Sequence, residues 1–216
     1  EKHGFYVDFY RSDNAISNDY LYHNIGDSVA LYTQDGKVLK QDEVLSYPCV
    51  GEDHPGLRYF RSVRTTGRNE STVVALFSAK LLNTGTSYMK MWMPASSDVS
   101  YFTALAPSAK TASSPYQSKP SLVVTMRKEK PAVEEPFVVV YEPISDKLST
   151  GLIESVDRIK LDSLGKKGCA IKVKTKEGDT FTLVNILKDG PVILNNQKCC
   201  GDFAIFAKRK GKNSVY

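Results

Sequence analysis

The chain has 216 residues, of which 41% are hydrophobic and 25% charged, a balance typical of a globular protein that buries a sizeable core without metals or cross-links. Its 29 Lys and Arg outnumber its 24 Asp and Glu, and the formal charge of +5 favours an acidic partner only slightly. No apolar run is long enough to span a bilayer, so we expect a soluble chain, either processed or cut from a longer one.

Short strands separated by turn residues begin the chain. In residues 4–11, three hydrophobic residues alternate with tyrosine and aspartate, which predicts a strand with one inner face. Turn residues follow, and we expect residues 20–24 to pair back on this strand as a hairpin. A third strand over residues 28–33 ends at the turn signal Asp35-Gly36.

The most strongly cationic stretch is predicted to be a strand over residues 57–65. A period of two places Arg58 and Arg64 on one side and Arg61 on the other. At least one of these arginines should then meet a covered surface, where it needs a partner or a ligand.

The stretch from Pro136 to Pro143 is the best candidate for the middle of the core. Its four apolar residues and Tyr141 lack the polar alternation of a one-sided strand, and prolines flank the run. This pattern predicts a strand covered on both faces. The spacing of strands between residues 57 and 141, with no helical period, suggests a sandwich.

The pattern of strands and turns in the last third of the chain predicts hairpins. Strands over residues 169–175 and 180–186 flank Glu177-Gly178-Asp179, a strong hairpin signal. We therefore predict an all-β protein of layered antiparallel sheets, of β-sandwich or supersandwich type, with little or no helix. Residues 1–143 would form a large sandwich and residues 144–216 a C-terminal hairpin subdomain packed on it, or the two would make one continuous domain.

Four cysteines show no paired C-x-x-C spacing and accompany only three histidines, which argues against a zinc ribbon or finger. They are Cys49, Cys169, Cys199 and Cys200. Free thiols or one disulfide both remain open. We predict no cofactor.

Binding residues are sought in the arginine stretch, which continues to Arg68. Planar guanidinium groups bind sulfated or carboxylated sugars well, and an aromatic side chain can stack on a sugar ring. The candidates for substrate binding are Arg58, Arg61, Arg64, Tyr59 and Trp92. The alternative is that these arginines pair with acidic residues of neighbouring strands. Nucleic acid is not expected, because the charge excess is small and no binding motif accompanies it.

Five segments follow one another in a recognisable order. They are Asp8-Phe9-Tyr10-Arg11, Asp19-Tyr20-Leu21-Tyr22-His23, Tyr88-Met89-Lys90-Met91-Trp92-Met93-Pro94, Pro136-Phe137-Val138-Val139-Val140-Tyr141-Glu142-Pro143 and Ile153-Glu154-Ser155-Val156. This order resembles the β-rich C-terminal half of heparinase II/III-like polysaccharide lyases. The Pro-Phe-x-x-x-Tyr-Glu-Pro run is its most specific part, and the resemblance covers most of the chain.

The resemblance implies a two-part enzyme that cleaves uronate-containing polysaccharides by β-elimination. An N-terminal helical α/α-toroid domain of the same polypeptide would carry most catalytic residues, and this chain, without a helical repeat, should be inactive alone. The resemblance also implies that His23, on the first sheets, takes part in catalysis. Where relatives often carry a histidine just before Asp19-Tyr20, this chain has Asn18.

Two histidines are also considered as possible metal ligands. His54 follows Glu52 and Asp53, and with Asp27 or His23 it could complete a cluster for a divalent cation. Nothing in the spacing fixes such a site, so no metal ligand is predicted. The other reading of His23 is a hydrogen-bonded structural histidine.

Two functions fit these observations, and a purely structural domain is a third possibility if acidic polysaccharides do not bind at low salt. The first is the non-catalytic or partly contributing β-sandwich portion of a secreted lyase that acts on acidic polysaccharide, located in the periplasm, outside the cell or at its surface. The second is a freestanding carbohydrate-binding or cell-surface adhesion module. A helical repeat encoded upstream of Glu1 would favour the first, and a signal peptide directly before it the second.

Overall fold

The computed structural model describes residues 4–48, 56–81, 85–107, 120–145, 151–160, 168–187, 191–194 and 197–216. Strands dominate these ranges, with one 3-10 turn, η1 (Leu57–Tyr59), and no α-helix among the described residues. The all-β prediction is confirmed. None of the helical structure in these ranges is long and apolar enough to cross a membrane.

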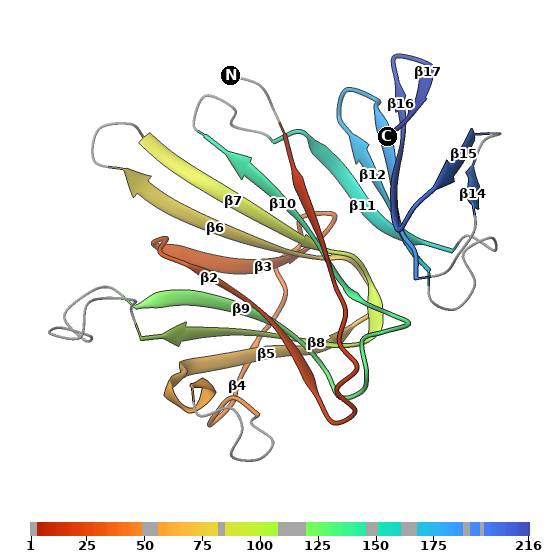
Figure 1. Cartoon of the computed structure of the whole chain (residues 1–216). Coiled ribbons are helices and arrows are strands. Elements are labelled where there is room, and N and C mark those ends of the chain that lie inside the picture. Colours follow the sequence, from red (N-terminus) through yellow and green to blue (C-terminus); the bar gives the residue numbers. More distant parts are fainter. Residues whose placement is uncertain are drawn as a thin grey trace, which may run out of the picture.

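Within the described ranges, three five-stranded antiparallel sheets and one hairpin form the fold (Figure 1). Sheet A has the order β1 (Tyr6–Tyr10), β10 (Phe137–Ile144), β7 (Gly85–Met93), β6 (Val73–Leu81), β3 (Ser28–Thr33). Sheet B has the order β2 (Asn18–Asn24), β9 (Ser121–Lys128), β8 (Ser96–Ala106), β5 (Arg61–Asn69), β4 (Asp42–Glu43). Sheet C has the order β11 (Ile153–Ile159), β12 (Cys169–Thr175), β13 (Thr180–Asn185), β16 (Phe203–Arg209), β17 (Lys212–Val215), and the hairpin pairs β14 (Pro191–Leu194) with β15 (Gln197–Cys200).

Sheet A is the middle layer, and β10 lies inside it. Phe137 and Val139 belong to the core shared with sheet B, whereas Val138 and Val140 belong to the core shared with sheet C. All four side chains are fully buried. The prediction of a strand covered on both faces is confirmed, because a central strand in a central sheet has no solvent face.

Two smaller cores lie outside these layers. One lies between the outer face of sheet C and the β14–β15 hairpin and contains Val184, Val192 and Phe206. The other lies on the outer face of sheet B and contains Tyr47 and Phe102. Described residues thus cover part of the outer face of each outer sheet.

The predicted hairpin between the first two strands is wrong. β1 pairs with β10 in sheet A, and β2 pairs with β9 in sheet B. The physical reason is the apolar face of β1: Phe5, just before the strand, packs edge-on against Phe181 of sheet C, with ring centroids 5.4 Å apart, and Phe9 packs likewise on Phe203 at 5.9 Å. Only a position in the middle layer provides that cover.

The predicted strand over residues 57–65 also needs correction. Its first part is η1, and β5 starts at Arg61 with a register shift between Arg61 and Arg64 and a positive φ of 50° at Ser62. The bulge breaks the strict period of two. All the arginines of this stretch are exposed, so none needs a buried partner.

The hairpin predicted around Glu177-Gly178-Asp179 is confirmed. Thr175 donates its amide to the Asp179 carbonyl over 2.9 Å, and Gly178 has a φ of +84°. That left-handed conformation suits glycine because it has no Cβ. Hairpins with local turns were thus easier to predict than pairings between distant strands.

Glu142 joins sheet A to sheet C. Its side chain is 1% exposed and accepts hydrogen bonds from the indole of Trp92 over 3.1 Å, from the amide of Ile153 over 2.8 Å and from the amide of Leu152. Gly151 approaches so closely that an added Cβ would lie 2.7 Å from the carboxylate, and its φ is +67°. One buried carboxylate thus fixes where the chain enters sheet C.

Candidate functional site

The predicted sugar-binding residues occupy different environments. Arg58 and Tyr59 are exposed on η1, and Arg61 and Arg64 are exposed on β5, where Arg64 lies opposite Glu43 of the short edge strand β4. Their role in binding sugar stays a prediction.

Trp92 is not available to a ligand. It is 4% exposed in the core between sheets A and C, and its indole N–H donates to Glu142. Stacking on a sugar ring needs an open aromatic face, which this tryptophan lacks. The prediction that Trp92 binds substrate therefore needs correction, because sheet C covers the face of sheet A on which Trp92 lies.

His23 lies on the outer face of sheet B. Its ring meets Phe60 edge-on, with centroids 6.2 Å apart, and partial burial lowers the pKa of His23. This contact brings His23 beside the end of η1, which carries Arg58 and Tyr59. His54, Glu52 and Asp53 lie outside the described residues, and no group of three or more potential metal ligands occurs within the described ranges.

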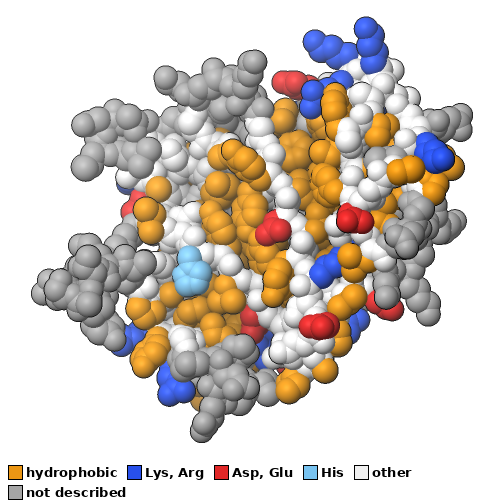
Figure 2. Space-filling view, viewed as in Figure 1, with side chains coloured by type: hydrophobic (Ala, Val, Ile, Leu, Met, Phe, Trp, Pro, Cys, Tyr) orange, Lys and Arg blue, Asp and Glu red, His pale blue; other side chains and the backbone are white. Residues whose placement is uncertain are grey.

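A different set of aromatic residues lines the seam where the edges of sheets A and B meet. We use "tyrosine seam" for Asp8 of β1, Tyr20 and Tyr22 of β2, and Tyr141 of β10. Figure 2 shows hydrophobic side chains, a class that includes tyrosine, at the surface in the middle of the face crossed by β1 in Figure 1.

Hydrogen bonds connect the tyrosine seam. The Tyr20 hydroxyl donates to Asp8 Oδ2 over 2.6 Å and lies 2.7 Å from the Tyr141 hydroxyl. Because a hydroxyl has one proton to donate, Tyr141 must donate to Tyr20. Asp8 is exposed, and its Oδ1 takes no hydrogen bond from the described part of the chain, so it can accept one from a ligand hydroxyl.

Both hydroxyls stay protonated at neutral pH. Burial, followed by the hydrogen bonds with Asp8 and Tyr141, raises the pKa of Tyr20 far above its usual value. Burial also raises the pKa of Tyr141 to about 12. The seam therefore offers neutral hydroxyls and one carboxylate, a set suited to sugar hydroxyl groups and without a cation to bind an acidic group.

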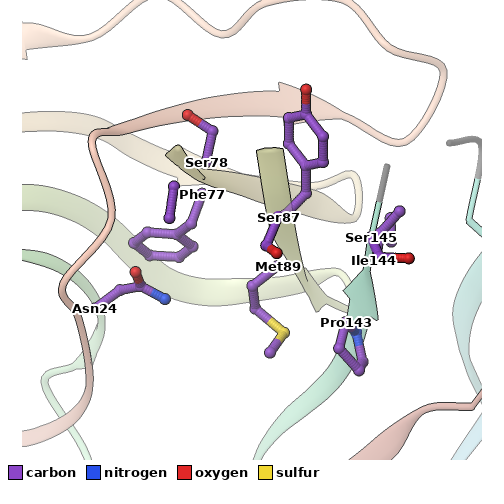
Figure 3. Close-up of a pocket in the computed structure, with 10 residues that line it drawn as sticks. Asn24, Phe77, Ser78, Ser87, Met89, Pro143, Ile144 and Ser145 are labelled. Carbon is purple, nitrogen blue, oxygen red and sulfur yellow. The ribbon is translucent and has the colours of Figure 1, made fainter. Parts of the chain in front are cut away.

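The seam leads toward a cavity of about 530 Å³ at the end of sheet A (Figure 3). Tyr22 packs on Tyr141 and Phe77, with centroids 5.0 and 5.3 Å apart. Phe77 also lines the cavity, where Met89 lies between Asn24 on one side and Pro143 on the other. The lining combines apolar surface with amide and hydroxyl groups, as ligand pockets often do.

Sequence reasoning missed this site. The alternation of β1 was read for its hydrophobic members, and these do pack on sheet C. The signal for the site lay in the other residues of the same alternation, which are Tyr6, Asp8 and Tyr10. They share one face with Tyr141, because Tyr6 pairs with Tyr141 in the register of sheet A.

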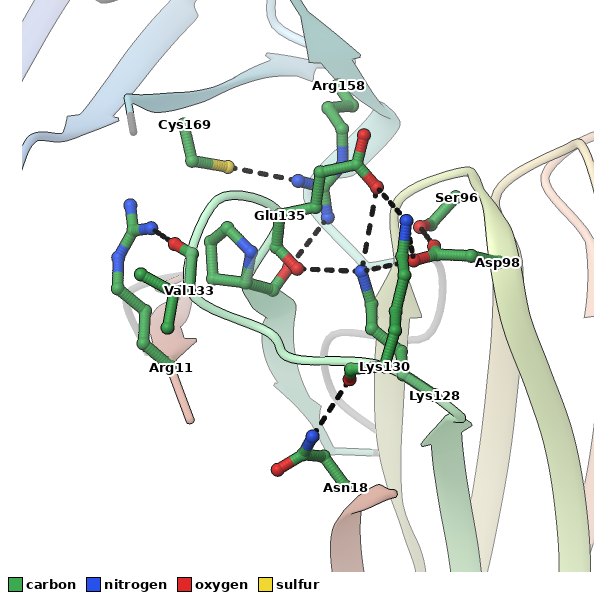
Figure 4. Close-up of polar contacts among 11 residues, drawn as sticks. Arg11, Asn18, Ser96, Asp98, Lys128, Lys130, Val133, Glu135, Arg158 and Cys169 are labelled. Carbon is green, nitrogen blue, oxygen red and sulfur yellow. Dashed lines mark hydrogen bonds and ion pairs between the residues drawn. The ribbon is translucent and has the colours of Figure 1, made fainter. Parts of the chain in front are cut away.

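A cluster of ion pairs lies away from the seam, at the end of β8 and β9 (Figure 4). Lys128 is fully buried, and its ammonium lies 3.1 Å from Asp98 Oδ2 and donates to the Glu135 carbonyl over 2.6 Å. Lys130 lies 2.9 Å from the same Asp98 oxygen. Burial alone would raise the pKa of Asp98, but hydrogen bonds from Ser96 and Lys130 and the charge of Lys128 lower it overall. These charges satisfy one another, which indicates a structural role.

The two cysteines whose side chains are described are both free. Cys169 is buried and free, accepts a hydrogen bond from Arg158 over 3.1 Å, and has a pKa raised by burial. Cys200 is free and exposed. Cys49 and the side chain of Cys199 lie outside the described residues, so the alternative of one disulfide stays untested.

Comparison with known proteins adds one relationship. No protein-family model matches the chain. An alignment over 149 residues, which covers 66% of this chain, shows 36% identity to part of an endo-acting ulvan lyase from Formosa agariphila. The chain spans 18% of the length of that lyase. It is thus related to one segment of a polysaccharide lyase and resembles it in sequence over most of its own length.

Proposed function

We propose that this chain is the β-sheet portion of a polysaccharide lyase and contributes to binding an acidic, uronate-containing polysaccharide. The observation that carries the proposal is the 36% identity to a segment of an ulvan lyase. The tyrosine seam supports it, because neutral hydroxyls, a carboxylate and aromatic surface suit the hydroxyl groups and apolar faces of sugar rings.

The proposal includes the finer features implied by the resemblance to heparinase II/III-like lyases. An N-terminal helical toroid of the same polypeptide would supply most of the catalytic residues, and the protein would work outside the cytoplasm. Residues 1–143 would be the sandwich and 144–216 a subdomain packed on it. β-Elimination needs a base, a group that neutralises the uronate carboxylate and an acid for the leaving oxygen in one cleft. The seam offers no cation among its residues, so the chain alone should bind and not cleave.

The binding test uses the 216-residue chain with polygalacturonate in isothermal titration calorimetry. Tyr20→Phe removes the hydroxyl that links Asp8 to Tyr141, and we expect affinity to fall roughly fivefold, the effect of losing about one hydrogen bond. Tyr32→Phe, on β3 at the opposite edge of sheet A, is the matched control and should bind like the wild type. Equal affinity in all three proteins would remove the seam from the binding site.

The assignment to a larger enzyme is tested at the gene. The reading frame upstream of Glu1 should encode a helical repeat, and the chain alone should release no unsaturated uronate product from the polymer. A signal peptide immediately before Glu1 would contradict the proposal and support a freestanding carbohydrate-binding module.

A further inference from the structure

The positive charge of this protein is concentrated in its last third. Residues 151–216 contain 13 Lys and Arg against seven Asp and Glu, a formal +6. Residues 1–150 contain 16 against 17 and carry −1. In Figure 2, Lys and Arg side chains gather at the end of the molecule where β16 and β17 meet. An acidic ligand is therefore attracted to the part of the chain that forms sheet C.

Lysines stand on the outer face of sheet C. Val173 and Ala207 point into the core shared with sheet A, so their neighbours Lys172, Lys174 and Lys208 point outward. The register places Thr180 directly between Lys174 and Lys208. Since neighbouring strands lie about 4.8 Å apart, the backbones at these two lysines are roughly 10 Å apart.

Hydrogen-bonding groups surround the lysines. Lys172 lies opposite Thr182, and Lys208 lies opposite Asn213 of β17. Together with Gln197 of the hairpin, these residues line a cavity of about 380 Å³ between sheet C and the β14–β15 hairpin. Hydroxyl and amide groups beside ammonium groups suit a polyhydroxylated anion.

The described residues do not neutralise the charges of these three lysines. Lys172, Lys174 and Lys208 form no ion pair within the part of the chain that the structure describes. Asp157 lies opposite Lys172, but its two oxygens accept hydrogen bonds from Gln34 and Ser155. Thr180 separates Lys174 from Lys208, so these like charges share one face of the sheet without standing directly opposite each other.

We propose that this outer face of sheet C is a second polysaccharide site that binds the carboxylate or sulfate groups of an acidic polymer. Lys172 and Lys208 contact the anionic groups, and Thr180, Thr182 and Asn213 bind hydroxyls. The inference rests on the proposed function for its ligand class, and it assigns the acidic groups to a surface other than the tyrosine seam. The core between sheets A and C separates this face from the seam, which lies between sheets A and B.

The test measures binding of the 216-residue chain to polygalacturonate, dextran sulfate and neutral dextran at low and high salt. The double variant Lys172→Gln/Lys208→Gln should bind its acidic polymer about tenfold more weakly at low salt, with a smaller loss at high salt. Comparing the first two polymers tells whether carboxylate or sulfate is preferred. Lys210→Gln/Lys212→Gln removes the same charge from the exposed β16–β17 turn and should change affinity at most about twofold.

Each remaining outcome decides a specific point. An equal loss in both double variants would overturn the site and leave only general attraction by net charge. Duplex DNA bound as tightly as the polysaccharide, with the same loss in Lys172→Gln/Lys208→Gln, would overturn the assignment to sugar. If the lysine variant binds normally but Tyr20→Phe does not, this inference fails and the proposed function stands. If the wild type binds no polymer, both fail.

Discussion

Charged residues serve different purposes in the two halves of the molecule. In the sandwich of sheets A and B, buried charges meet opposite charges: Arg127, 3% exposed, donates two hydrogen bonds to Asp19, and Lys128 meets Asp98. On sheet C, the outward lysines form no ion pair with described residues. The same residue types thus stabilise one region and remain available to a ligand in the other. The net charge of the chain does not distinguish charges in buried ion pairs from charges that lack such a pair.

The largest expected effect comes from breaking a buried pair in the sandwich. Asp98→Asn leaves the ammonium of Lys128 buried beside a neutral amide, and we expect the free energy of unfolding to fall by about 4 kcal/mol. Urea unfolding measures it. Asp42→Asn removes an equal charge from the pair with Lys40, whose side chain is 90% exposed, and should cost less than about 0.5 kcal/mol. Similar costs at both positions would contradict the structural role of the Asp98 cluster.

The joint between the two halves should give the next largest effect. Glu142→Ala leaves the donors from Trp92, Leu152 and Ile153 unpaired in the interior, at about 1 kcal/mol each or about 3 kcal/mol in total. Glu142→Gln retains one acceptor oxygen and should lose less. If the Glu142 carboxylate holds sheet C against sheet A, the near-UV circular dichroism signal of Trp92 should change in the alanine variant. An alanine variant as stable as the wild type would show that sheet C docks without this carboxylate.

Acid should weaken the sandwich through the same aspartate. The lowered pKa of Asp98 means that the unfolded chain takes up this proton first as pH falls, so the stabilisation is complete above about pH 4 and is lost progressively below it. Between about pH 5 and pH 2 the wild type should lose at least about 1 kcal/mol more than Asp98→Asn. Thermal unfolding at several pH values measures this difference. Parallel curves would show that other carboxylates govern acid unfolding.

The smallest effect is expected on sheet C. Because Lys172 and Lys208 form no ion pair with the described residues, Lys172→Gln/Lys208→Gln should change the free energy of unfolding by no more than about 0.5 kcal/mol. The contrast with Asp98→Asn would separate charges kept for stability from charges kept for binding. A loss of 2 kcal/mol or more would place these lysines in the structural group.

Local signals in the sequence predicted local structure. The apolar run of β10 and the turn at Gly178 were sufficient because composition and turn chemistry act within a few residues. The pairing of β1 with β10 could not be predicted in this way, since its partner lies more than a hundred residues away. The same limit applies to the sites. Asp8, Tyr20 and Tyr141 meet only after three strands from two sheets come together, and the burial of Trp92 depends on sheet C.

The place of β1 also affects how the chain can fold during synthesis. Tyr6 pairs with Tyr141, so β1 is synthesised long before β10, its partner in sheet A, has left the ribosome. At roughly 5 to 20 residues per second, this wait lasts on the order of ten seconds. Throughout that time Phe5 and Phe9 have neither sheet A beside them nor sheet C above them. The middle layer is therefore completed late, and the nascent protein exposes an unpaired apolar strand that chaperones would need to protect.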